Sequence, residues 1–110
     1  MSTRIGALEE LILLAVGGLG SQAYAVVVQQ QIEEASMRSP TMGAIYTSLE
    51  RLEDKGLLKS ELGDVTPKPG GRRKRFYRLT GLGATALTTT RSTREKLWAN
   101  LQLGGVGGKA

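Results

Sequence analysis

The chain has 110 residues, enough for one small domain, and it contains neither cysteine nor histidine. These absences exclude disulfides, zinc sites of the Cys/His kind and catalytic triads that use imidazole, so we expect no enzyme. The formal net charge is +5, but residues 1–64 carry five basic and nine acidic side chains, whereas residues 65–110 carry ten basic and one acidic. Residues 65–94 hold eight cations and no carboxylate, which favours a polyanion such as nucleic acid as partner; the alternative is a solvated basic face.

The longest unbroken apolar stretch runs from Leu11 to Leu19. It is too short for the roughly 18 residues that cross a bilayer, so we expect no membrane span. A lone Arg4, the acidic pair before the stretch and the lack of a clear cleavage site also argue against a secretion signal. We therefore expect a cytoplasmic protein.

Two helices are predicted near the N-terminus. Apolar residues recur at helical spacing at Leu8, Leu11, Ile12, Ala15, Val16 and Leu19. Leu13 and Leu14 widen this stripe, so we expect the first helix to face both its own core and another surface. Gly17, Gly18 and Gly20 should close it, and Ser21 should cap a second helix. The apolar positions of that second helix are Tyr24, Val27, Val28, Ile32 and Ala35.

A third helix is predicted from about Met42 to Lys55, with Thr41 as its cap and Gly56 as its stop. Two strands should follow, Leu57–Leu62 and Arg75–Leu79, around a loop rich in proline and glycine that has the character of a wing. A last helix should begin after Thr80 and run towards Leu101. The expected fold is mainly α with a small β-hairpin. It divides into a winged helix-turn-helix DNA-binding domain (1–80), a C-terminal dimerisation helix (81–103) and a disordered glycine-rich tail (104–110).

The third helix has the pattern of a recognition helix. Ile45, Leu49 and Leu52 share a core face, while small and hydrogen-bonding groups occupy the opposite face near the N-terminus, as entry into the major groove requires. The expected contacts to DNA from this helix are Thr41, Gly43, Thr47 and Arg51; for each the alternative is a solvated helix face. We expect Glu50 and Asp54 to lie beyond the phosphates, because carboxylates and phosphates repel each other.

The predicted wing carries cations that could bind phosphates. Four of them are consecutive, from Arg72 to Arg75. Phosphate contacts by these cations would raise the affinity for DNA through counterion release, but they would contribute little to sequence specificity. The expected phosphate contacts are Lys68, Arg72, Arg73, Lys74 and Arg75.

The run from Gly43 to Leu58 and the later run from Gly71 to Thr80, followed by Gly83, resemble the PadR-like transcriptional regulators. The shared pattern is a glycine, an aliphatic residue, a tyrosine, leucines, a basic residue and a glycine stop, then a basic-aromatic-Tyr-Arg-Leu-Thr strand. The resemblance covers about residues 8 to 101 and points to the short subfamily with a single C-terminal helix. It implies a dimeric winged helix repressor that binds a palindromic promoter site and is released by an effector. It also implies that Tyr46 contacts the DNA backbone; packing under the wing is the alternative.

The last helix is expected to make a homodimer. A seam at spacings of three and four is formed by Leu87, Thr90, Arg94, Leu97 and Leu101. Trp98 lies beside it and needs a surface to bury against, and Leu14 on the first helix is the expected companion. The resemblance adds that short family members pair through this helix and that some bind flat apolar ligands at the dimer centre. Trp98 is therefore a candidate contact for an aromatic effector; a plain interface or core anchor is the alternative.

The leading prediction is a transcriptional regulator that binds double-stranded DNA in a sequence-specific way. The alternative is a protein-interaction module that uses the winged helix as a scaffold. RNA binding is less favoured because one Trp, three Tyr and one Phe leave few aromatics for stacking on single strands. No metal site of the Cys/His kind is expected because the chain lacks both residues, and no cofactor is expected because the glycines at 17, 18 and 20 end a helix instead of opening one after a strand.

Overall fold

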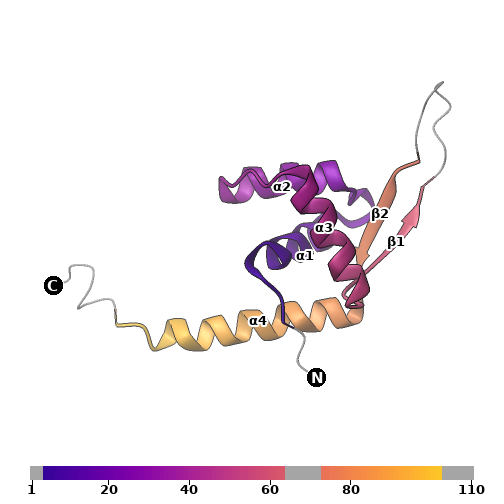
Figure 1. Cartoon of the computed structure of the whole chain (residues 1–110). Helices are drawn as coiled ribbons and strands as arrows, with labels where there is room; N and C mark the ends of the chain where they lie inside the picture. The colour runs from indigo at the N-terminus through magenta and orange to yellow at the C-terminus, as the bar shows by residue number, and fades with distance from the viewer. Residues whose placement is uncertain (1–3, 64–72, 103–110) are drawn as a thin grey trace.

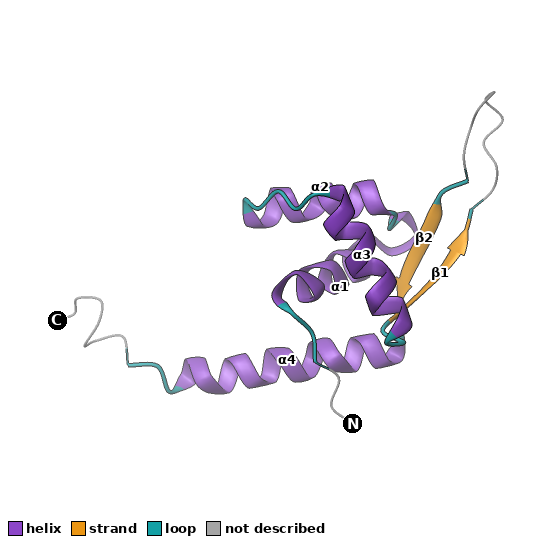
Figure 2. Cartoon of the chain, viewed as in Figure 1, coloured by secondary structure: helices purple, strands orange, loops and turns teal. Residues whose placement is uncertain are grey.

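The computed structural model describes residues 4–63 and 73–102. Its elements are α1 (Ala7–Leu19), a 3₁₀ turn (Gly20–Gln22), α2 (Ala25–Ser36), α3 (Met42–Asp54), β1 (Leu58–Leu62), β2 (Arg75–Leu79) and α4 (Gly81–Ala99). The first three helices pack together, the hairpin projects from one side of them, and α4 begins at the hairpin base, passes α1 and extends away from the rest of the fold (Figures 1 and 2). The predicted fold, mainly α with a small β-hairpin in winged helix-turn-helix order, is confirmed. Lys68, Arg72 and the tail 104–110 lie outside the described residues.

The core forms where α1, α2, α3 and the start of the hairpin meet. Its fully buried large side chains are Ile12, Leu13, Val16, Val28, Ile45, Leu49, Leu52, Leu57 and Leu58. The predicted core face of α3 is therefore confirmed. The wide stripe on α1 divides between two environments: Leu13 belongs to the core, whereas Leu14 is 52% exposed.

The predicted start of the second helix is wrong. Helix α1 continues through Gly17 and Gly18 and stops only at Gly20, whose φ of +61° is the left-handed geometry that glycine favours. Ser21 therefore lies in the 3₁₀ turn, and α2 begins after Tyr24, which makes no side-chain capping bond. Local capping chemistry at Ser21 is overridden because Ala23, two residues later, is drawn completely into the core.

The two predicted threonine caps are confirmed. Thr41 Oγ1 accepts a hydrogen bond from the Ala44 N–H at 3.0 Å, and Thr80 Oγ1 accepts one from the Gly83 N–H at 3.0 Å. Because each cap fixes the first turn of its helix, the starts of α3 and α4 match the sequence prediction.

The hairpin is antiparallel and pairs Leu58 with Leu79 at its base and Leu62 with Arg75 at its outer end. It is also tied to the connection between α1 and α2. The Tyr77 N–H donates to the Ala23 carbonyl at 2.8 Å, which makes that segment a short third partner of β2. The wing root therefore has a fixed position relative to the helices.

Gly83 is buried where α4 crosses the hairpin base, and we expect its replacement by alanine to destabilise the fold. An added Cβ would overlap the Leu57 carbonyl oxygen and lie 2.8 Å from Leu79 Cδ1. We expect Gly83→Ala to lower the free energy of unfolding in urea by about 2 kcal/mol or more. Gly81→Ala is the matched control, because a Cβ at Gly81 meets nothing within 4 Å and alanine favours helix. Equal stability of the two variants would show that α4 does not approach the hairpin this closely.

A partly buried ion pair joins the start of α1 to the end of α3. Lys55 Nζ lies 3.1 Å from Glu9 Oε1 and also donates to the Arg4 carbonyl at 2.9 Å. Burial alone raises the pKa of the Glu9 carboxyl, but the hydrogen bond from the Gly6 N–H and the Lys55 ammonium outweigh it, so the pKa lies below the usual 4.5.

A depressed carboxyl pKa in the folded state stabilises the protein above the unfolded-state pKa, and this stabilisation is lost as the pH falls through the folded-state value. We expect Glu9→Gln to lower the free energy of unfolding by about 1 kcal/mol at pH 7. The difference from the wild type should shrink once the pH drops below about 4.5. Unfolding titrations at a series of pH values measure this, and a difference that does not vary with pH would contradict the assignment.

Within the described residues, no helix is both long enough and apolar enough to cross a membrane.

Candidate nucleic-acid interface

The first two turns of α3 present an exposed and unobstructed surface. Thr41, Gly43 and Thr47 are all exposed, as predicted for residues that approach base edges. A Cβ placed on Gly43 would meet only Thr41 Oγ1, at 3.9 Å, so the space outside this glycine is open. Tyr46 is 54% exposed, and its phenol is therefore not buried among the described residues.

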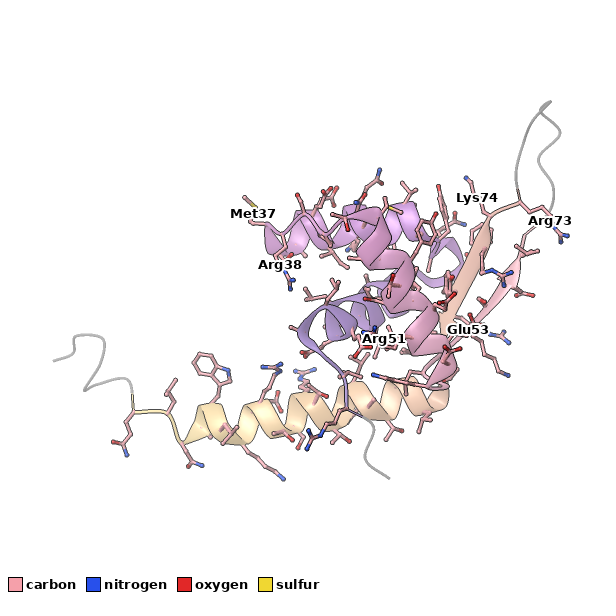
Figure 3. All side chains as sticks on the ribbon, in the orientation of Figure 1. Met37, Arg38, Arg51, Glu53, Arg73 and Lys74 are labelled. Carbon is pink, nitrogen blue, oxygen red and sulfur yellow. The ribbon has the colours of Figure 1, made fainter. Side chains whose placement is uncertain are left out.

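Arg51 lies on a different side of α3 from Tyr46. Its positive charge is close enough to Glu9 on α1 to contribute to the lowered pKa of that carboxyl. Figure 3 shows Arg51 in the middle of the molecule, well away from the wing. Arg51 is exposed, so it stays a predicted DNA contact, but it lies away from Arg73 and Lys74 of the wing root (Figure 3).

Two cations stand at the root of the wing, beside the start of α2. Lys74 Nζ lies 4.3 Å from the centre of the Tyr24 ring, and Tyr24 in turn meets Phe76 edge-on with 5.5 Å between ring centres. The Arg73 Nε–H donates to the Gly63 carbonyl at 2.7 Å. Both side chains are exposed at the end of the hairpin that projects from the helices (Figure 3). Such anchored cations suit phosphate oxygens, because less side-chain freedom is lost on binding.

Arg75 has a partner within the protein. Its Nη1–H donates to Ser60 Oγ at 3.1 Å, and the Ser60 hydroxyl donates to Glu53 Oε2 at 2.7 Å. This chain of hydrogen bonds braces the hairpin against the last turn of α3. Beside it, burial raises the pKa of the Tyr77 phenol, and the Glu53 carboxylate raises it further. The predicted phosphate contact of Arg75 therefore competes with a structural role.

Sequence reasoning did not identify Tyr24, Ser60 and Glu53 as residues that shape this surface. Tyr24 was expected only as an apolar position of the second helix, whereas it supports Lys74. Ser60 alternates with Leu58 and Leu62 along β1, and a polar residue on the inward face of a strand is a signal that a partner is needed. The partner itself lies elsewhere in the chain and cannot be read from that signal.

A second exposed surface lies on α4. Leu97 and Trp98 are 67% and 65% exposed, and Leu101 beyond the helix end is also exposed. Leu87, nearer the start of α4, packs partly against the core, so the predicted seam divides into a covered and an open half. Arg94 Nη2–H donates to Glu10 Oε1 at 2.9 Å, and Leu14 with Leu87 lines a groove between α1 and α4 beside this pair. Exposed apolar patches of this kind mark interaction sites.

Among the described residues, no three acidic side chains gather in a way that could hold a metal ion.

Comparisons with known proteins agree on one kind of protein. A family model described as the transcriptional regulator PadR-like family matches residues 13–89. Transcriptional regulator Rv3488 of Mycobacterium tuberculosis is 46% identical over 63 residues, which make up 57% of this chain and 54% of that protein. Among solved structures, a PadR-like transcription factor from Bacteroides fragilis has a TM-score of 0.72 at 29% identity, covering 84% of each chain. A PadR family transcription regulator from hypervirulent Clostridium difficile has a TM-score of 0.74 at 26% identity, covering 94% of this chain and 100% of that one.

Proposed function

Because the chain belongs to the PadR-like family of transcriptional regulators, we propose that it is a repressor that binds a palindromic promoter site as a homodimer. PadR-like proteins are transcription regulators and not enzymes, which confirms the prediction that this chain is no enzyme. The observation that carries the proposal is the exposed and unobstructed surface of the first two turns of α3, in a chain whose wing root also exposes two cations. The proposal places the protein in the cytoplasm with its DNA.

In this proposal α3 enters the major groove by its first two turns. Thr41 and Thr47 carry hydroxyl groups that can donate to or accept from base edges, and Gly43 lets the helix come close. Tyr46 reaches the backbone at the edge of the groove, while Arg73 and Lys74 contact phosphates of the adjoining stretch. This division matches the general rule that phosphate contacts position a protein and base contacts specify its site.

The salt dependence of duplex binding tests the wing. Each phosphate contact releases counterions, so log affinity falls with log salt by about 0.9 per contact. We expect Arg73→Ala and Lys74→Ala each to flatten this slope by about one unit, on specific and random duplexes alike. Lys96→Ala is the control, since it removes one exposed cation from α4 and should leave the slope unchanged. A slope that Arg73→Ala and Lys74→Ala leave unaltered would exclude the wing from the interface and favour the protein-interaction alternative.

The proposed homodimer forms through the open half of α4. Leu97, Trp98 and Leu101 would lose their contact with water there, and a two-fold axis would place two copies of α3 for two half-sites. Leu14 on α1 is also exposed, in the groove beside α4 that Leu87 lines with it. Trp98, as the large aromatic at this surface, is the proposed contact for a flat aromatic effector, whose binding would quench its fluorescence.

A further inference from the structure

Two carboxylates, those of Glu50 and Asp54, lie on the exposed face of α3 beyond the turns assigned to DNA contact. We call this outward face of the helix its crest. We propose that one of them, Glu50, is a specificity-determining residue that accepts a hydrogen bond from the N4 amino group of a cytosine in the major groove. This inference rests on the proposed function, because it presumes that α3 enters the groove. It revises the expectation that both carboxylates lie beyond the phosphates.

Glu50 lies on the same face as the residues that lead α3 into the groove. Counted along the helix, Gly43, Thr47 and Glu50 follow the spacing of four and three that aligns side chains on one side. The opposite side holds the fully buried Ile45, Leu49 and Leu52, which fixes this face outward. Glu50 is exposed there, so its side chain is free to meet a ligand that covers the crest.

The direction of the side chain brings the carboxylate nearer to the helix start than its backbone is. Side chains of an α-helix point towards its N-terminus and cover the preceding turn. By this rule we expect the carboxylate of Glu50 to lie at the level of Tyr46 and Thr47, within the part of α3 expected to enter the groove. Its negative charge is also close enough to the hairpin to contribute, with Tyr46, to the raised pKa of Tyr77.

No cation of the described residues neutralises Glu50. The ion pairs within residues 4–63 and 73–102 join Lys55 to Glu9, Arg91 to Glu95 and Arg94 to Glu10. An unpaired carboxylate brought among phosphates is repelled, and it is tolerated only where a hydrogen-bond donor meets it.

The major groove offers one base whose edge suits a carboxylate. Cytosine presents its N4 amino donor there without an acceptor that would repel the second oxygen. Adenine also presents an amino donor, at N6, but its N7 acceptor lies alongside and opposes a carboxylate. Glu50 would thus favour a C·G pair and penalise the other three.

Asp54 is a natural control on the same crest. It follows Glu50 by four residues, about 6 Å along the helix axis, and its side chain is one methylene shorter. Its carboxylate therefore stays beyond the region that Glu50 reaches.

The test begins with a duplex selected from a random pool by the wild-type protein. Each base pair of a half-site is then replaced by the other three, and affinities are measured for the wild type, Glu50→Ala, Glu50→Gln and Asp54→Ala. At one position per half-site, the wild type should prefer C·G about tenfold or more. Glu50→Ala should bind all four pairs at that position within about twofold, while preferences elsewhere persist. Glu50→Gln should move the preference to A·T, because an amide pairs with N6 and N7 of adenine together.

Two outcomes would overturn the proposal separately from the function it rests on. If Glu50→Ala binds every duplex more tightly and keeps the wild-type ranking, Glu50 only repels phosphates. If Asp54→Ala and not Glu50→Ala loses a preference, the reading carboxylate is the wrong one. Failure of the wild type to enrich any duplex sequence would instead remove the proposed function, and this inference with it.

Discussion

Replacing Gly43 with leucine is expected to abolish specific DNA binding while leaving the fold intact. Gly43 lies at the entrance of α3, and an added Cβ would meet only Thr41 Oγ1 at 3.9 Å, so the folded protein has room for a larger side chain. Leucine is also a better helix former than glycine, and the variant should be at least as stable as the wild type. In the complex, the same side chain would fill the space where α3 approaches the base edges.

We expect the affinity of Gly43→Leu for the selected operator to fall about 10³-fold, to the level of random DNA, because specific binding exceeds non-specific binding by at least that factor. Binding to random duplexes should change little, because contacts between the wing cations and the DNA phosphates dominate it. Gly81→Leu adds the same side chain at an exposed glycine of α4 with open space around it and should bind like the wild type. Full operator affinity of Gly43→Leu would show that α3 does not enter the groove by its first turns.

The second large effect is expected on the oligomeric state, when charges are placed on the exposed half of α4. If the proposed homodimer forms through this surface, we expect Leu97→Asp combined with Trp98→Asp to convert it into a folded monomer. The two side chains are 67% and 65% exposed, so the charges meet water in the monomer and do not disturb its core. In the dimer the same charges would be buried against the partner without counterions.

The monomer should bind an operator with two half-sites about 10²–10⁴-fold more weakly, because the second recognition helix no longer acts at high effective concentration. Its affinity for a single half-site should be unchanged. Thr85→Asp with Thr89→Asp places two acids elsewhere on the same exposed helix and should leave the dimer intact. Sedimentation measures the oligomeric state of both double variants. A dimeric Leu97→Asp, Trp98→Asp variant would exclude this surface from the interface.

Features that depend on neighbouring residues were accessible from the sequence. The threonine caps at 41 and 80 and the bounds of β2 were predicted as observed, because capping and strand alternation act over a few residues. The buried face of α3 followed from helical periodicity in the same way. These elements were enough to give the winged helix order.

Features that depend on which distant segments meet were not accessible. Glu9 and Lys55 are far apart in the chain, and their ion pair exists only because α1 packs against the end of α3. The closeness of the Arg51 charge to Glu9 and the engagement of Arg75 by Ser60 have the same origin. Periodicity places a residue on a face, but the element that covers this face decides whether a cation is free for DNA or bound within the protein.

Selection of bound sequences from a pool of random duplexes, at physiological salt and with the intact chain, tests the central claim most directly. The account predicts enrichment of an inverted repeat whose half-site centres lie one helical turn of DNA apart, or a multiple of it, because a two-fold dimer presents two copies of α3. A pool in which no sequence is enriched, or one dominated by a single unrepeated site, would contradict a homodimeric, sequence-specific regulator.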